Sequence, residues 1–134
     1  MNIEWVIACR YVEVHDSLAT IIGGGIDTYW LTELPSPLQV VLAVRALATA
    51  EELEAGETHR VRNVVRDPDG NQIGEMRGDI AIEGEAARPD FLVGITLPMV
   101  VQFEATQEGT FSIDVAIDDA SRALPIHVVH GAPA

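Results

Sequence analysis

Lysine is absent from this chain of 134 residues, and all eight basic residues are arginines. A Schiff-base nucleophile and a phosphate-loop lysine both need an ε-amine, which the guanidinium group of arginine cannot replace. The sequence therefore excludes enzyme mechanisms that depend on either group.

Cysteine is almost absent, because Cys9 stands alone and cannot form an internal disulfide. The first residues include Glu4 and lack both the basic segment and the small-residue cleavage site of a secretion signal. No apolar run approaches the ~20 residues that a membrane-spanning helix needs. We therefore expect a cytoplasmic protein without a membrane partner.

Positive charge is scarce, since the formal net charge is -13. The acidic residues are spread from Glu4 to Asp119, which indicates the solvated surface of a folded domain rather than an acidic disordered tail. Phosphate contacts supply most of the affinity of proteins for nucleic acids. We therefore expect no nucleic-acid partner.

Long helical patterns are also missing, and short stretches of alternating apolar and polar residues take their place. The clearest is Gly109–Ile117, whose apolar face consists of Phe111, Ile113, Val115 and Ile117. Residues 123–130 read as the returning strand, with Pro125 at a solvent-facing edge. Such spacing predicts an all-β fold: an antiparallel β-sandwich with immunoglobulin-like or C2-like Greek-key topology, seven to nine strands and at most one short helix.

A second hairpin is predicted around a turn at Asp67, Pro68, Asp69, Gly70 and Asn71, with arms at Thr58–Arg66 and 72–83. Simple alternation from this turn would place charged residues of the second arm on the core face. A bulge near Gly74 or Gly78 would return Met76, Ile80 and Ile82 to the core.

Three segments, 5–14, 38–48 and 91–103, are apolar on both faces. Central strands covered on both sides have this character, and a subunit contact is the other explanation. Residues 49–56 carry an N-cap, a capping-box glutamate and a closing glycine, so they predict the one short helix. We expect a single domain over residues 1–130 and a loose tail over 131–134.

Three consecutive glycines, Gly23, Gly24 and Gly25, follow an apolar strand. No helix pattern follows them, which argues against a phosphate or dinucleotide site. One interpretation is a bulge or a change of sheet where backbone approaches backbone. The other is a ligand- or partner-binding site, which would use the glycines together with Asp27, Tyr29 and Trp30.

Acidic turns offer one weak metal hypothesis. Asp67 and Asp69 resemble the start of a calcium loop, but the later ligand positions do not match. Asp118 and Asp119 form a second acidic turn, and two such turns at one end of a sandwich could share a calcium ion. The leading interpretation is that there is no metal site.

No group of residues has the arrangement of an active site. The four histidines lack chelating spacing, the Cys9 thiol is expected to be buried and inert, and no nucleophile elbow is present. The arginine-rich arm, with Arg60, Arg62 and Arg66, is expected to pair with nearby acids. We therefore predict a protein that is not an enzyme and that holds no cofactor.

The order of landmarks resembles a bacterial family of proteins of unknown function, domain of unknown function family 6941, over nearly the whole chain. The matching residues are Glu4-Trp5, Tyr11 to Val14, the glycine triplet with Asp27 and Trp30, Leu34-Pro35, His59-Arg60, Asp67 to Gly70 and Gly109-Thr110-Phe111. Ile26 replaces an expected aromatic residue, and the loop at 83–90 is short. The resemblance implies a β-sandwich of bacterial or phage origin and transfers no site residue.

Two functional hypotheses follow from the sequence. The first is a non-enzymatic interaction module that binds a protein partner or forms a homo-oligomer, based on the doubly apolar strands. The second is a small-ligand or carbohydrate-binding module that uses Tyr29, Trp30 and the acidic turns, with calcium as an aid.

Overall fold

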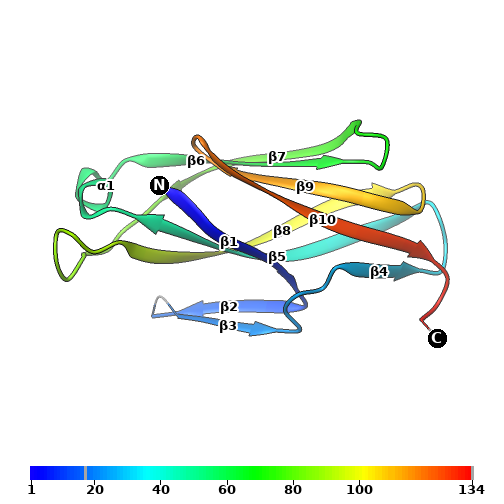
Figure 1. The fold of residues 1–134 in the computed structure, drawn as a ribbon, viewed down its shortest axis with the longest axis horizontal. Helices are drawn as coiled ribbons and strands as arrows, with labels where there is room; N and C mark the ends of the chain where they lie inside the picture. Colours follow the sequence, from blue (N-terminus) through cyan, green and yellow to red (C-terminus); the bar gives the residue numbers. More distant parts are fainter. Residues whose placement is uncertain (17, 134) are drawn as a thin grey trace.

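The computed structural model describes residues 1–16 and 18–133 and is mostly β-structure (Figure 1). A single six-residue helix, α1 (Ala50–Ala55), interrupts the strands, and no helix in the described part is long and apolar enough to cross a membrane. Ten strands are present, where the sequence predicts seven to nine: β1 (Asn2–Cys9), β2 (Tyr11–His15), β3 (Leu18–Ile22), β4 (Thr28–Leu31), β5 (Ser36–Ala48), β6 (Thr58–Arg66), β7 (Gln72–Ala81), β8 (Val93–Ala105), β9 (Gly109–Ile117) and β10 (Ala120–His130).

The strands form three sheets, ordered β1-β5-β8, β4-β10-β9-β6-β7 and β2-β3. Every pair is antiparallel except β4 and β10, which run parallel and so depart from the predicted antiparallel arrangement. The extra strands arise because the apolar segment at 5–14 is divided at Arg10 into β1 and β2, which belong to different sheets. Sequence alternation alone does not locate such a division.

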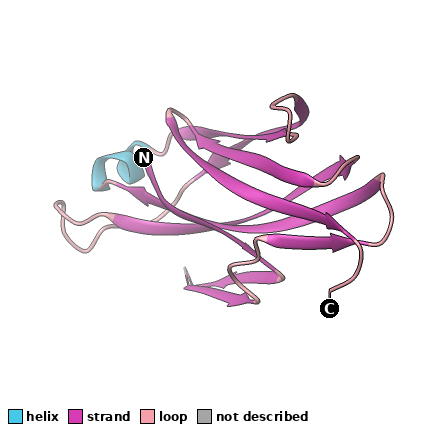
Figure 2. Ribbon diagram, turned by 45° about the vertical axis from the view of Figure 1, so that its right-hand side comes forward, coloured by secondary structure: helices cyan, strands magenta, loops and turns pink. Residues whose placement is uncertain are grey.

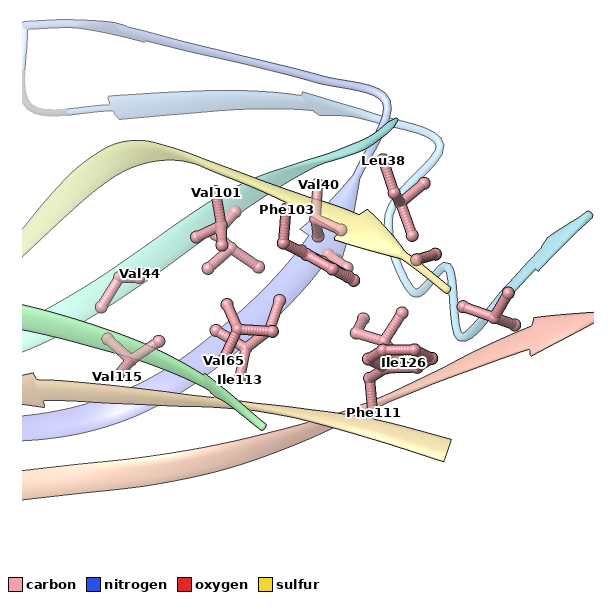
Figure 3. Close-up of a cluster of buried hydrophobic side chains, with 14 of the residues drawn as sticks. Leu38, Val40, Val44, Val65, Val101, Phe103, Phe111, Ile113, Val115 and Ile126 are labelled. Carbon is pink, nitrogen blue, oxygen red and sulfur yellow. The ribbon is translucent and has the colours of Figure 1, made fainter. Parts of the chain in front are cut away.

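One core fills the space between the three-stranded and the five-stranded sheet (Figure 3). From one side come Val40, Leu42 and Val44 of β5, and from the other comes the inner face of β9, whose four apolar residues are fully buried as predicted. The rings of Phe103 on β8 and Phe111 on β9 meet at 5.4 Å between centroids. The apolar alternation of these strands therefore determines which face of each sheet lies inside.

The hairpin of β6 and β7 contains the predicted bulge. Asp67 and Asn71 pair across the turn, and the register shifts next to Val65, so that Ile73 becomes the extra residue beside Gly74. Met76 and Ile80 then lie opposite inward-facing residues of β6, as the sequence requires. The charged residues of β7 consequently face solvent.

Helix α1 begins and ends at the predicted signals. The Thr49 hydroxyl accepts a hydrogen bond from the Glu52 amide at 3.1 Å, the Glu52 carboxylate accepts one from the Thr49 amide, and Gly56 closes the helix in a left-handed conformation. Leu53 packs with Ala48 and Ile82 in a small second cluster. The helix thus covers one end of the core.

The hairpin of β2 and β3 lies on the side of β5 that faces away from the five-stranded sheet (Figures 1 and 2). Strand β2 contacts β5 and β8, and Ala43 and Cys9 on this side are buried although they lie outside the main core. The doubly apolar segment 38–48 is therefore a central strand with cover on both faces, the first of the two explanations. Pro125 of β10 lies opposite β9, and β4 pairs only with residues 127–130, so Pro125 has a free side as predicted.

Candidate functional site

The glycine triplet carries the chain from the β2–β3 hairpin to β4 in another sheet. The Gly25 and Ile26 amides both donate to the Ala8 carbonyl, at 2.8 and 3.1 Å. Gly23 has a φ of 63°, and a Cβ at this position would lie 2.8 Å from Cγ of Arg10. The tight crossing at the end of β1 explains the triplet, in agreement with the interpretation as a change of sheet.

Asp27, Tyr29 and Trp30 follow this crossing without forming one surface. The Asp27 carbonyl accepts a hydrogen bond from the His127 amide at 2.7 Å, which starts the pairing of β4 with β10. Tyr29 packs against the core, where burial raises the pKa of its phenol, whereas the adjacent Trp30 is 46% exposed on the opposite face. The two aromatic side chains therefore cannot stack on one ligand in this arrangement.

The solvent-facing side of hairpin β2–β3 carries three large exposed apolar side chains. Tyr11 pairs with Ile22 and His15 pairs with Leu18, so all four residues share one face of this two-stranded sheet. The exposed fractions are 48% for Tyr11, 74% for Leu18 and 55% for Ile22. We call these three side chains the hairpin patch.

Glu13 is the charged centre of that face. It contacts His15 and accepts a hydrogen bond from the Tyr11 hydroxyl at 2.9 Å. The His15 contact, and after it the Tyr11 hydrogen bond, lowers the pKa of Glu13, and the same carboxylate raises the pKa of Tyr11. The Glu13 carboxylate therefore lies on the same face as the three side chains of the hairpin patch.

Two of the three arginines of β6, Arg62 and Arg66, pair with acids as the sequence predicts, whereas Arg60 forms no ion pair within residues 1–16 and 18–133. The Arg62 Nε lies 2.8 Å from Oε1 of Glu75, Arg77 contacts the same carboxylate, and Arg66 Nε lies 3.3 Å from Oδ2 of Asp114. Arg62 and then Arg77 lower the pKa of Glu75 to about 2. Two carboxylates thus neutralise part of the positive charge on this outer face.

The two acidic turns lie at opposite ends of β6. Asp118 lies beside Arg60 near the start of the strand, whereas Asp67 follows its last residue. The Asp67 carboxylate already accepts hydrogen bonds from the Asp69 and Asn71 amides, each at 2.9 Å. A calcium ion shared by Asp67, Asp69, Asp118 and Asp119 is therefore incompatible with this fold.

The Asp118 carboxylate instead contacts the buried side chain of His59. Its Oδ2 lies 2.6 Å from Nδ1 of His59, and its Oδ1 accepts a hydrogen bond from the Arg60 amide at 2.9 Å. The His59 contact lowers the pKa of Asp118, and the Arg60 amide acts in the same direction. The opposite nitrogen of His59, Nε2, is buried without a partner within residues 1–16 and 18–133.

Comparison with known protein families gives one result. A family described as "Family of unknown function (DUF6941)" matches residues 4–129. This chain belongs to that family. Among curated proteins, none matches the chain.

Two landmark segments of the DUF6941 resemblance, at Gly109 and at Pro68, contact each other. Gly109 has a φ of 132°, and a Cβ there would lie 2.8 Å from Cγ of Pro68 in the turn between β6 and β7. The two landmark segments therefore pack against each other with no room for a side chain. Leu34 and Pro35, another landmark, are joined by a cis peptide bond. These DUF6941 landmarks shape turns and crossings.

The sequence assigns no site to three residues of this DUF6941 member whose environments stand out. His59 and Asn63 are buried polar residues on the inner face of β6, and Leu18 is the most exposed residue of the hairpin patch. The parity of β6 could have revealed the first two, because both share a face with Val61 and Val65. No three His, Cys, Asp or Glu residues of the described chain form a group that could hold a metal ion.

Proposed function

We propose that this DUF6941 member is a non-enzymatic interaction module that binds a protein partner through the hairpin patch. The observation that supports the proposal is the exposure of Tyr11, Leu18 and Ile22 on one face of β2–β3. Clustered exposed apolar side chains are typical of interaction surfaces, whereas single ones need no explanation.

The opposite side of hairpin β2–β3 packs against the rest of the protein and stabilises the hairpin. Val12 and Val14 alternate with the patch residues and are half-buried, and β2 contacts β5 and β8. A two-stranded sheet is only marginally stable by itself, so this burial is needed to hold the hairpin. The patch residues play no part in that burial and are available for a partner.

Charge favours a partner other than a second copy. At a formal net charge of -13, two copies repel each other, and Glu13 would add a carboxylate from each copy to the contact. A partner with an apolar contact surface surrounded by arginine or lysine would be attracted instead. We therefore propose a basic protein partner.

The test compares the wild-type protein with a Tyr11→Ser/Ile22→Thr variant and an Ile73→Thr control. Ile73 is an exposed isoleucine, 40% accessible, on β7 rather than on the hairpin. We select the proteins that the wild type and the control capture but the double variant does not. Each selected protein is purified, and its affinity for the wild type, the control and the double variant is measured by calorimetry. We expect one of them to be basic and to bind at least about tenfold more weakly to the double variant.

Two results would count against this function. The purified candidates could bind all three proteins equally, which would show that the hairpin patch is not the contact. Alternatively, sedimentation of the wild-type protein could show a dimer that the double variant loses, which would identify a second copy as the partner.

The alternative function, a small-ligand or carbohydrate-binding module at Gly23–Gly25, Asp27, Tyr29 and Trp30, has less support. Tyr29 and Trp30 point to opposite faces of β4, and the backbone crossing accounts for the glycines.

We also propose that the two larger sheets make up a β-sandwich, because they share one core. This β-sandwich would form a single domain over residues 1–130.

A further inference from the structure

A pocket lies at the side of the molecule where the edges of the two larger sheets face each other. β7 is the last strand of one sheet and β8 is the last strand of the other. The pocket between them has a volume of about 280 Å³, just below the ~300–1,000 Å³ that is typical of sites for small ligands. Its wall includes Val61, Asn63, Met76, Ile80, Leu97 and Met99.

Asn63 is the buried polar group of this wall. It is only 4% exposed, and its Nδ2 has a weak acceptor, the Met99 sulfur at 3.6 Å. Its Oδ1 is buried and has no hydrogen-bond partner in the part of the chain that the structure describes. Buried amides normally have partners, so an unpaired one in a pocket wall indicates a ligand that supplies the missing hydrogen bond.

The other residues of the pocket wall can rearrange around a bound ligand. Met76 lies directly across from Asn63 on β7, and Met99 lies beside the amide. Methionine side chains are flexible and fill irregular spaces, so they can move aside when a ligand enters. Gly78 leaves additional space, because a Cβ at this position would meet no atom within 4 Å.

We propose that this pocket binds a small apolar molecule that carries one alcohol hydroxyl, with the hydroxyl bonded to the Asn63 side chain. A hydroxyl both donates and accepts, so it can satisfy the amide in either orientation. The apolar body would lie among Val61, Leu97 and the two methionines. The pocket shares no residue with the hairpin patch, so a test of ligand binding to the pocket is independent of the proposed protein partner.

The chain offers a direct measurement, because it contains three methionines and two of them line the pocket. Protein labelled with ¹³C at the methionine methyl groups is titrated with hexan-1-ol and, separately, with its isomer 1-methoxypentane, which has no hydroxyl. We expect saturable shifts of the Met76 and Met99 signals and none of Met1. Hexan-1-ol should bind about tenfold more tightly, the effect of one hydrogen bond to a buried group.

Gly78→Val is the matched pocket variant. Gly78 pairs with Val61 on the inward-facing side, so a valine side chain would fill the pocket while the strand backbone accepts it. We expect the Met1 signal to stay unchanged and the hexan-1-ol shifts to disappear. Equal affinity for the two isomers, shifts that never saturate, or unaltered binding by Gly78→Val would each overturn the proposal.

Discussion

Hairpins β9–β10 and β2–β3 both carry several apolar side chains, but in opposite environments. The apolar face of β9 is completely buried in the main core, while the hairpin patch on β2–β3 is 48–74% exposed. Each hairpin also supplies a carboxylate that contacts a histidine: Asp118 in the β9–β10 turn contacts His59 of β6, and Glu13 of β2 contacts His15 of the same strand. Apolar side chains thus fill the core in one hairpin and are exposed to solvent in the other.

The two histidine contacts differ mainly on the histidine side. The carboxylates have similar exposures, 40% for Asp118 and 42% for Glu13, but the His59 side chain is 6% exposed and the His15 side chain 74%. Water can replace Glu13 as a partner of His15, but it cannot easily reach His59. The same pair of residue types therefore supports folding where the histidine is buried and contributes little where it is exposed.

The largest predicted effect concerns matched isoleucines. Ile113→Ala on β9 should lower the free energy of unfolding by about 2–5 kcal/mol, because it leaves a cavity among fully buried side chains. Ile22→Ala on β3 should cost far less, because the isoleucine is 55% exposed. Urea denaturation of both variants measures the difference. Similar losses would mean that the hairpin patch is part of the folding core.

The sequence predicted features that depend on near neighbours or on parity. The inner face of β9 follows from one-sided alternation, the helix limits follow from the Thr49 and Gly56 signals, and the bulge beside Gly74 follows from a conflict between charge and alternation. Each of these involves residues close in the chain or an apolar pattern that only one face of a sheet can bury.

Features that depend on distant pairing were not predicted. The calcium hypothesis requires the acidic turns at Asp67 and Asp118 to lie at one end of the sandwich, but β6 and β9 are antiparallel neighbours, so the turns that follow them lie at opposite ends. For the candidate site, one interpretation of the glycine triplet is a bulge or a change of sheet, and the chain does change sheet there. The pairing of His59 with Asp118 requires the β6–β9 register, which a single sequence does not contain.

A second prediction concerns the carboxylates. Asp118→Ala should destabilise the protein by about 1–3 kcal/mol, because it leaves Nδ1 of the buried His59 without a partner. Glu13→Ala is the matched control and should cause no resolvable loss, because His15 remains hydrated. Thermal denaturation of both variants at neutral pH measures this contrast. Equal losses would contradict the assignment of the stabilising role to burial of the histidine.

The third prediction is a pH dependence. The folded state lowers the pKa of Asp118 below its ordinary value of 3.8, so the unfolded chain takes up a proton first as the solution becomes acidic. The stabilisation is complete above that value and is lost as the pH falls through the folded pKa. The stability difference between wild type and Asp118→Asn should therefore narrow at acidic pH. Denaturation curves at successive pH values test this, and a difference that widens below pH 3.8 would contradict it.

The smallest predicted effect on stability is that of Ile22→Thr, a substitution that keeps a β-branched residue in β3. We expect a change within about 0.5 kcal/mol, since the side chain faces solvent and the strand preference is retained. Calorimetric unfolding of this variant next to Ile73→Thr measures it, because both isoleucines are exposed but only Ile22 belongs to the hairpin patch. If Ile22→Thr instead destabilised the monomer strongly while Ile73→Thr did not, the patch would be needed for folding, and its apolar character would no longer require a partner.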